Sequence, residues 1–205
     1  MAKRFEDKLG KRQLTRLSNL MDVVYALAIW RLFMFLPRPQ EDETRTVWQV
    51  FSEDPQSILT VVIGMVIVII YWLQNNQLFA HLARTDTRHT VLSILQIFCL
   101  LIFLYAIGLG TRYDPATDLR VLESLTALLV GVPSYFAWRH AKFEGRLLAS
   151  SVSKQQADDI SVRILAEPIT AALTLPFVAL PWLWEMAWLS FPLVQRLLRR
   201  KAEVL

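Results

Sequence analysis

The sequence predicts an all-α, polytopic membrane protein with six transmembrane helices. Of its 205 residues, 54% are hydrophobic. These residues fall in blocks of about 17–20, the length with which a helix crosses roughly 30 Å of hydrocarbon. Charged residues lie mainly between the blocks. A soluble helical domain would instead place its apolar residues along one side of each helix, so the block pattern indicates a membrane protein.

The predicted spans cover residues 17–36, 57–73, 91–109, 121–138, 164–180 and 182–198, and residues 1–205 form one transmembrane domain. The first span ends at a proline pair around Arg38, and a tight turn at Pro181 joins the last two spans. Between the first two spans, Trp48 and Phe51 suggest a short interfacial segment. We expect the polar stretch 139–163 to form an amphipathic cytoplasmic helix and a turn.

Lysine and arginine indicate the orientation of the chain in the membrane. They are frequent before the first span, in the stretch 139–163 and in the C-terminal tail, and rare in the loops that would lie outside. Basic residues in short loops favour the cytoplasmic side, so both termini are predicted to be cytoplasmic. The net charge of +4 follows this topology and does not indicate a nucleic-acid partner. The single six-span unit without eukaryotic sorting signals favours a prokaryotic inner (plasma) membrane.

No pattern in the sequence indicates an enzyme, a metal site or a cofactor. His81, His89 and His140 lack metal-ligand spacing, and we expect them in loops with solvated side chains. A glycine-rich phosphate loop and a zinc-protease motif are both missing. No catalytic residue is therefore predicted.

Ionisable residues within the spans are the candidate functional groups, because each costs several kcal/mol in a bilayer unless it is paired or hydrated. They are Asp22, Arg31, Glu123, Glu167 and Glu185. Arg31, Glu123 and Glu185 share the outer depth of the membrane, so Arg31 has Glu123 and Glu185 as possible partners. The alternatives for Arg31 are a snorkelling or helix-locking role and a place along a conduction path.

Two segments resemble the lysosomal and prokaryotic potassium channels of the transmembrane protein 175 family. Residues 16–29 read Arg-Leu-Ser-Asn-Leu-Met-Asp-Val-Val-Tyr-Ala-Leu-Ala-Ile, similar to the family's opening helix. Residues 70–79 read Ile-Tyr-Trp-Leu-Gln-Asn-Asn-Gln-Leu-Phe, similar to the end of its second helix. The resemblance implies a homotetrameric cation channel of the single six-helix, prokaryotic type with no reentrant pore loop. It implies that four copies of the first helix surround an axis.

Carried over by position, Leu27 and Met34 match apolar rings of the constriction, and Arg16 and Asp22 match an inner polar network. The sequence departs from the family where Trp30 and Arg31 replace threonine and leucine. If the side of the helix that carries Leu27, Arg31 and Met34 lines the axis, four guanidinium groups surround the pore. At about 6 Å and an effective dielectric of about 20, each opposes a cation by roughly 3 kcal/mol, about 11 for four.

The leading hypothesis is therefore a potassium-permeable channel whose hydrophobic constriction is formed by Leu27, Trp30, Arg31 and Met34 of each subunit. Its expected partners are further copies of the chain, potassium or other monovalent cations, and membrane lipid. Trp30 and Arg31 leave two alternatives open. One is a non-conducting structural or accessory membrane protein of the same fold. The other is an anion- or proton-permeable pore, for which a ring of arginines would be favourable.

Overall fold

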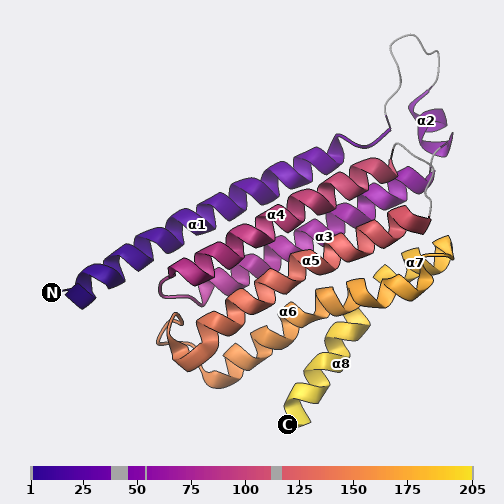
Figure 1. Ribbon diagram of the computed structural model, residues 1–205. Helices are drawn as coiled ribbons and strands as arrows, with labels where there is room; N and C mark the ends of the chain where they lie inside the picture. The colour runs from indigo at the N-terminus through magenta and orange to yellow at the C-terminus, as the bar shows by residue number, and fades with distance from the viewer. Residues whose placement is uncertain (1, 38–45, 54, 112–116, 205) are drawn as a thin grey trace.

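The computed structural model describes residues 2–37, 46–53, 55–111 and 117–204, and every regular element in these ranges is helical. Five long helices run side by side in one bundle (Figure 1). They are α1 (Ala2–Phe33), α3 (Pro55–Ala80), α4 (Thr87–Gly110), α5 (Thr117–Lys142) and α6 (Lys154–Thr174). Shorter elements complete the fold: α2 (Val47–Glu53), η1 (Phe143–Gly145), η2 (Leu175–Phe177), α7 (Pro181–Trp188) and α8 (Phe191–Val204).

Four segments in the described part of the chain are long and apolar enough to cross a membrane. They are α3, α4, α5 and the segment Lys154–Phe177, which correspond to the second to fifth predicted spans. Helix α1 contains residues 17–33 of the first predicted span and ends at Phe33, and Asp22 and Arg31 lower the hydropathy of its apolar part. The structure therefore supports an integral membrane protein with at least four candidate spanning helices.

The sixth predicted span is not a single helix. Residues 182–198 are divided between α7 and α8, with a break at Leu189 and Ser190. Pro192 explains the break, because proline has no N–H for the carbonyl of Trp188 four residues earlier and its ring would clash with that carbonyl. Helix α8 continues from this break and packs against α6 (Figure 1).

The stretch 139–163 does not form a separate amphipathic helix, so that prediction was wrong. Its first residues are the last turn of α5, which ends at Lys142, and η1 and a short connection follow. Its last residues already belong to α6. Ser153 caps this helix by accepting a hydrogen bond from the Gln156 N–H, and the Gln156 side chain accepts one from the Ser153 N–H. This capping box starts the helix ten residues before the predicted span.

Three buried aromatic side chains hydrogen-bond across the helix contacts. The Tyr25 hydroxyl on α1 accepts from Gln96 on α4 at 3.0 Å. The Tyr71 hydroxyl on α3 donates to the Ala127 carbonyl on α5 at 2.8 Å. The Trp138 indole on α5 donates to the Ala157 carbonyl on α6 at 3.2 Å. Because lipid offers no hydrogen-bond partners, such internal pairing is what permits polar atoms in the core of a membrane bundle.

Polar contacts gather at the end of the bundle where α4 begins. Asp86 caps α4 through the His89 N–H, and its other oxygen pairs with the His140 ring at 2.8 Å. Partial burial opposes ionisation of Asp86, but the His89 N–H and the His140 ring hold the pKa of its carboxyl below its usual range. This carboxylate therefore stabilises the fold at neutral pH, and the contribution is lost as the pH falls through the lowered pKa.

Two of the three histidines are not solvated loop residues, contrary to the sequence prediction. His89 lies in the first turn of α4, is fully buried and hydrogen-bonds Thr85 at 2.9 Å. His140 lies near the end of α5 and is paired with Asp86. Within the described residues, no group of histidine, cysteine or acidic side chains could hold a metal ion.

The close contact between α5 and α6 generates a stability prediction. A Cβ atom at Gly131 would lie 2.8 Å from Cδ of Pro168, whose ring cannot rotate away. We expect Gly131→Ala to lower the free energy of unfolding by about 1–2 kcal/mol, because overpacking outweighs the helix propensity gained by replacing glycine. Thermal unfolding of the detergent-solubilised protein measures this change.

Gly64→Ala is the matched control. Its added Cβ would meet the end of the flexible Ile107 side chain, which can adopt another rotamer. A smaller loss of stability is therefore expected for Gly64→Ala. If Gly131→Ala were as stable as the wild type, α5 and α6 would have to be less closely packed than the structure shows.

Candidate functional site

Helix α1 has two apolar sides. One side is buried against α3 and α4, and its residues recur every three or four positions: Leu17, Met21, Tyr25, Ala28 and Leu32. The other side carries large apolar residues with exposed fractions of 46% to 57%: Leu20, Val23, Leu27, Trp30 and Phe33. The apolar residues on both sides of α1 therefore need cover, by protein on one side and by lipid or protein on the other.

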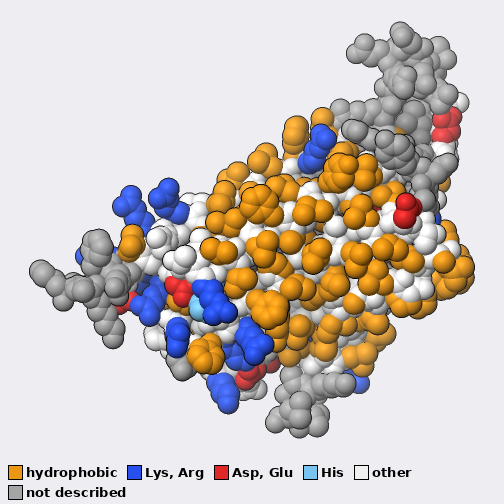
Figure 2. All heavy atoms as spheres, in the orientation of Figure 1, with side chains coloured by type: hydrophobic (Ala, Val, Ile, Leu, Met, Phe, Trp, Pro, Cys, Tyr) orange, Lys and Arg blue, Asp and Glu red, His pale blue; other side chains and the backbone are white. Residues whose placement is uncertain are grey.

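Leu27 points away from the rest of the chain. Its side chain is 57% exposed, as is that of Trp30 one turn further on. Figure 2 shows that hydrophobic side chains cover the middle of the bundle on the face drawn there, and that lysine and arginine gather toward the end that carries the N-terminus. The exposed side of α1 is thus free within one subunit to contact lipid or a second copy.

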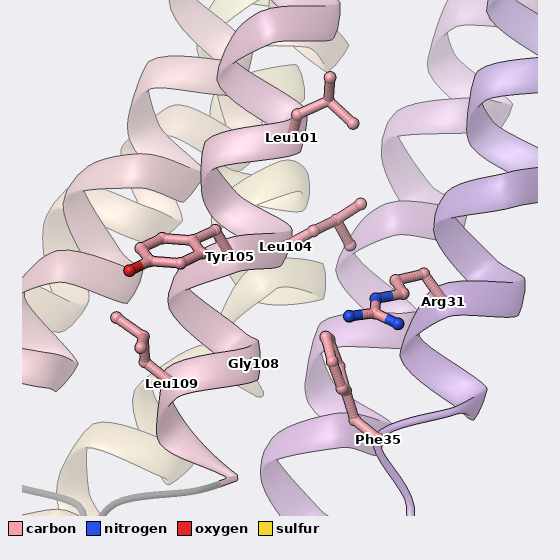
Figure 3. A pocket seen from close by; sticks show the side chains of 7 residues that line it. All are labelled: Arg31, Phe35, Leu101, Leu104, Tyr105, Gly108 and Leu109. Carbon is pink, nitrogen blue, oxygen red and sulfur yellow. The ribbon is translucent and has the colours of Figure 1, made fainter.

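Arg31 lies at the edge of this exposed side and is directed toward α4 (Figure 3). Its guanidinium carbon lies 4.8 Å from the centre of the Phe35 ring, a cation–π distance. Phe35 packs closely against Gly108 of α4. A Cβ atom added to Gly108 would lie 2.7 Å from the Phe35 ring, so only glycine fits there. These residues line a cavity of about 350 Å³ between the two helices, together with Leu101, Leu104, Tyr105 and Leu109.

The two expected partners of Arg31 lie elsewhere in the subunit. Glu123 is 5% exposed, and its carboxylate packs against Gly110 at the end of α4. Glu185 is half-buried on α7. Among the residues that the structure describes, no ion pair joins Arg31 to Glu123 or Glu185. Its observed partner within one subunit is therefore an aromatic ring.

Met34 follows the last residue of α1, and its side chain is half-buried. Its N–H donates to the carbonyls of Trp30 and Arg31 at 3.1 Å each, so the chain is still turning at this point. Met34 therefore continues the course of the helix close to the direction of Leu27, seven residues earlier.

Asp22 faces α3. Its carboxylate accepts a hydrogen bond from the Trp72 indole at 3.0 Å. The Asn76 amide also contacts this pair. With its nitrogen toward Asp22 it donates to the carboxylate at 3.1 Å, and its oxygen accepts from Trp72 at 3.1 Å. The two sequence segments that carry the resemblance thus meet in space through their polar side chains.

Arg16 does not join this group within one subunit. It is exposed and lines a groove between α1 and α4, whose other residues include Gln13, Thr87 and Val91. Six residues separate it from Asp22, which places the two on different sides of a helix. Sequence reasoning missed Trp72 and Asn76 as the partners of Asp22. Their place in the second resembling segment was the signal that could have indicated them.

Comparisons with known proteins agree with these features. Residues 16–104 match the model of the family described as endosomal/lysosomal potassium channel TMEM175. A potassium channel of Streptomyces collinus is 23% identical over 174 residues, which cover 81% of this chain and 84% of the relative. A potassium channel of Chamaesiphon minutus is 25% identical over 175 residues, 82% of this chain and 86% of the relative.

The fold is shared with solved structures. A lysosomal potassium-selective channel TMEM175 homolog from Chamaesiphon minutus superimposes with a TM-score of 0.71 and 19% identity, over 93% of this chain and 98% of the other. A variant of the potassium channel MtTMEM175, solved with a nanobody fusion protein, gives a TM-score of 0.65 and 16% identity, over 93% and 94% of the two chains.

These relatives are described as channels, in agreement with the expectation that the chain is not an enzyme. The match of residues 16–104 contains both segments on which the resemblance was based. By sequence over this region and by fold over nearly its whole length, the chain is similar to the potassium channels of the TMEM175 family.

Proposed function

We propose that this protein is a potassium-permeable channel of the inner membrane of a prokaryote, built from four copies whose α1 helices surround a common axis. The observation that carries the proposal is the exposed apolar side of α1, on which Leu27 is 57% exposed and turned away from its own subunit. A single chain leaves this side uncovered. The proposal is further supported by the potassium channels among the relatives of the chain.

The constriction in this assembly is a set of apolar rings. Leu27 forms the narrowest ring, and Met34 forms another about two turns further along the axis. Apolar rings control conduction through pore width and dewetting, without a carbonyl filter of the kind that a reentrant loop provides. Trp30 lies on the same exposed side as Leu27 and narrows the path between the two rings.

Arg31 is compatible with cation conduction if its charge is held off the axis. The structure supports this arrangement, because the guanidinium is directed toward α4 and lies over the Phe35 ring (Figure 3). In this position the guanidinium lies farther from a cation on the axis than it would if the four arginine side chains pointed inward. The electrostatic repulsion of the cation falls as that distance grows. In the assembly, Glu123 or Glu185 of a neighbouring copy remains the proposed counter-ion.

The proposed orientation places both termini in the cytoplasm. Basic side chains gather at the end of the bundle that carries the N-terminus (Figure 2), as the positive-inside rule requires of a cytoplasmic side. Helix α1 then runs outward, and the Asp22–Trp72–Asn76 group lies in the inner half of the membrane. Arg31 lies in the outer half.

A second candidate function is favoured by Trp30. Its side chain is 57% exposed on the side that would face the axis, and four indoles there are bulky enough to close a narrow path. The chain would then be a non-conducting membrane protein of the same fold. An anion- or proton-permeable pore is the corresponding alternative if Arg31 turns inward.

Ion flux from reconstituted liposomes tests the proposal directly. With potassium, sodium and chloride gradients compared in parallel, we expect potassium flux to exceed the other two. Chloride flux would instead indicate an arginine-lined pore. Proteoliposomes without flux would support the non-conducting alternative, provided that cross-linking shows the protein to be assembled.

Leu27→Ala tests the constriction. We expect a several-fold larger potassium flux and a lower preference for potassium over sodium, because a smaller side chain widens the ring and admits more water. Leu125→Ala is the control, since Leu125 is also exposed but lies on α5. Equal effects of the two substitutions would show that Leu27 does not line the pore.

Arg31→Leu tests the position of the charge. We expect potassium flux to change by no more than a few-fold and assembly to weaken slightly, because the substitution removes a cation–π contact away from the axis. Arg139→Leu, at an exposed site on α5, is the control for loss of charge. A gain of more than about a hundredfold, equivalent to roughly 3 kcal/mol, would show that Arg31 faces the axis.

A further inference from the structure

Helix α8 covers the bundle with one side and leaves an apolar and basic surface on the other. Val194 is buried where α8 packs against α6. Leu193 and Leu197 are 59% and 53% exposed, although both are large apolar residues. Three arginines are exposed beside them: Arg196, Arg199 and Arg200. The two leucines and the three arginines line one groove on the surface of α8, called here the α8 groove.

Helical spacing explains why both kinds of side chain meet in the α8 groove. Leu193 and Leu197 are four residues apart, as are Arg196 and Arg200. Each of these leucines also precedes one of these arginines by three residues. Positions three and four residues apart are neighbours on a helix surface. An apolar row therefore runs directly beside a cationic row.

The chain does not neutralise the charge of this groove. Among the side chains that the structure describes, no acidic group forms an ion pair with an arginine of α8. Residues 191–205 contain four basic residues and a single acidic one, Glu203, so a positive excess remains. A cluster of basic residues on an amphipathic helix next to a membrane span is typical of sites for anionic lipid.

Helix α8 runs toward the start of α6. The Trp184 N–H donates to Ser124 at 2.9 Å, and the Ser124 hydroxyl is hydrogen-bonded to Thr174 in the last turn of α6. Phe191 lines a cavity together with Glu167, which precedes Thr174 in α6 by two turns. Between Trp184 and Phe191 the chain thus advances toward the start of α6. Helix α8 continues in this direction while it leaves the bundle (Figure 1).

This course brings the arginines to the boundary of the membrane. The first and the last of them lie about 8 and 14 Å beyond Phe191 along α8. The same distances from Glu167 along α6 reach about residues 158–162, directly before the apolar run that begins at Ile164. Headgroups lie where a span passes from polar to apolar sequence. The arginines are therefore at headgroup depth, and Leu193, about one turn earlier, is in the hydrocarbon.

The α8 groove stays accessible to lipid in the proposed assembly. Helix α8 packs against α6, whereas α1 packs against α3 and α4. Figure 1 shows α1 and α8 on opposite sides of the bundle. With α1 around the axis, α8 lies at the outer rim, where the surrounding molecules are lipids.

We propose that the α8 groove binds an anionic phospholipid of the inner leaflet. Its arginines bind the phosphate through charge-assisted hydrogen bonds, and Leu193 and Leu197 contact the acyl chains. The site selects for net charge, because a zwitterionic headgroup also carries an ammonium group that the guanidinium groups repel. The leaflet follows from the proposed orientation of the chain, but binding does not depend on conduction.

Fluorescence quenching by brominated lipids tests this site. A bimane label is placed at Leu189→Cys, an exposed position one turn before the groove, after Cys99→Ser removes the free cysteine. Nanodiscs of phosphatidylcholine receive equal fractions of phosphatidylglycerol or phosphatidylcholine with brominated acyl chains. We expect phosphatidylglycerol to be at least about fivefold enriched at the label, the gain that one basic residue gives near a membrane surface. Equal quenching by the two lipids would overturn the proposal.

A second label position separates this site from the surface of the protein as a whole. Leu129→Cys places bimane on α5, where the side chain is 47% exposed and distant in sequence from the basic cluster. We expect the two brominated lipids to quench this label equally. Enrichment of phosphatidylglycerol at Leu129 to the same extent as at Leu189 would contradict a site on α8.

Substitution of the arginines identifies the groups that select the lipid. Glutamine at all three positions, Arg196→Gln, Arg199→Gln and Arg200→Gln, should abolish the enrichment at Leu189, and lysine at all three should keep it. The matched control removes three exposed positive charges from α1: Lys8→Gln, Lys11→Gln and Arg12→Gln. The control should keep the enrichment. Enrichment that survives the three glutamines of α8, or that the control also abolishes, would overturn the proposal.

A second copy of the chain is the alternative occupant of the α8 groove. Light scattering of the purified protein in detergent should give the same mass for the wild type and for the variant with three glutamines in α8. A smaller mass of this variant would show that the arginines hold a neighbouring copy, and would overturn the lipid site. The lipid measurements need no ion flux, so a protein that does not conduct would refute the proposed channel and leave this test intact.

Discussion

The two-sided character of α1 is the constraint on which the structure depends. One side supplies Tyr25 and Leu32 to the core, where both are almost fully buried. The opposite side carries Leu27 and Trp30, for which the chain itself provides no cover. Because one side of α1 must be buried in the core and the other side is not covered by the chain, α1 can lie neither in the interior of the bundle nor apart from the bundle. It is fixed at the edge of the bundle, which is where the proposed assembly needs it to lie.

Polar groups within the bundle are placed where they link helices. Asp22 on α1 contacts Trp72 on α3, and Tyr25 contacts Gln96 on α4, so neighbouring positions of α1 are tied to two different helices. In hydrocarbon these contacts have no competition from water, and an unpaired partner would be costly. Glu167 and Trp188 differ from this pattern, because each keeps a buried atom without a partner in the described structure.

Much of the fold could be predicted from sequence, since the second to fifth spans are long apolar blocks that override local detail. The sixth span could not be predicted from hydropathy, because Pro192 divides a segment that is mainly apolar before it and basic after it. The stretch 139–163 was misassigned because its polarity hides the capping box at Ser153, from which α6 starts. Helix ends depend on single hydrogen bonds, which average hydropathy does not report.

The candidate site was predictable to a smaller extent. The resemblance identified Leu27 as a residue of interest, and the structure shows that its side chain is exposed on the single chain. The sequence could not reveal that Arg31 lies over Phe35, since that contact depends on Gly108 of α4 leaving space for the ring. Trp72 and Asn76 were also missed as partners of Asp22. Contacts between helices far apart in sequence require the packing to be known.

The links from α1 to α3 and α4 also bear on how the proposed channel would open and close. Because Asp22 and Tyr25 are anchored three residues apart to different neighbours, α1 cannot rotate about its own axis without breaking one of these hydrogen bonds. Its position is thereby coupled to that of the whole subunit. A central passage lined by α1 would change its width through tilting of entire subunits or through side-chain rotamers at Leu27 and Trp30, and not through independent twisting of the lining helix.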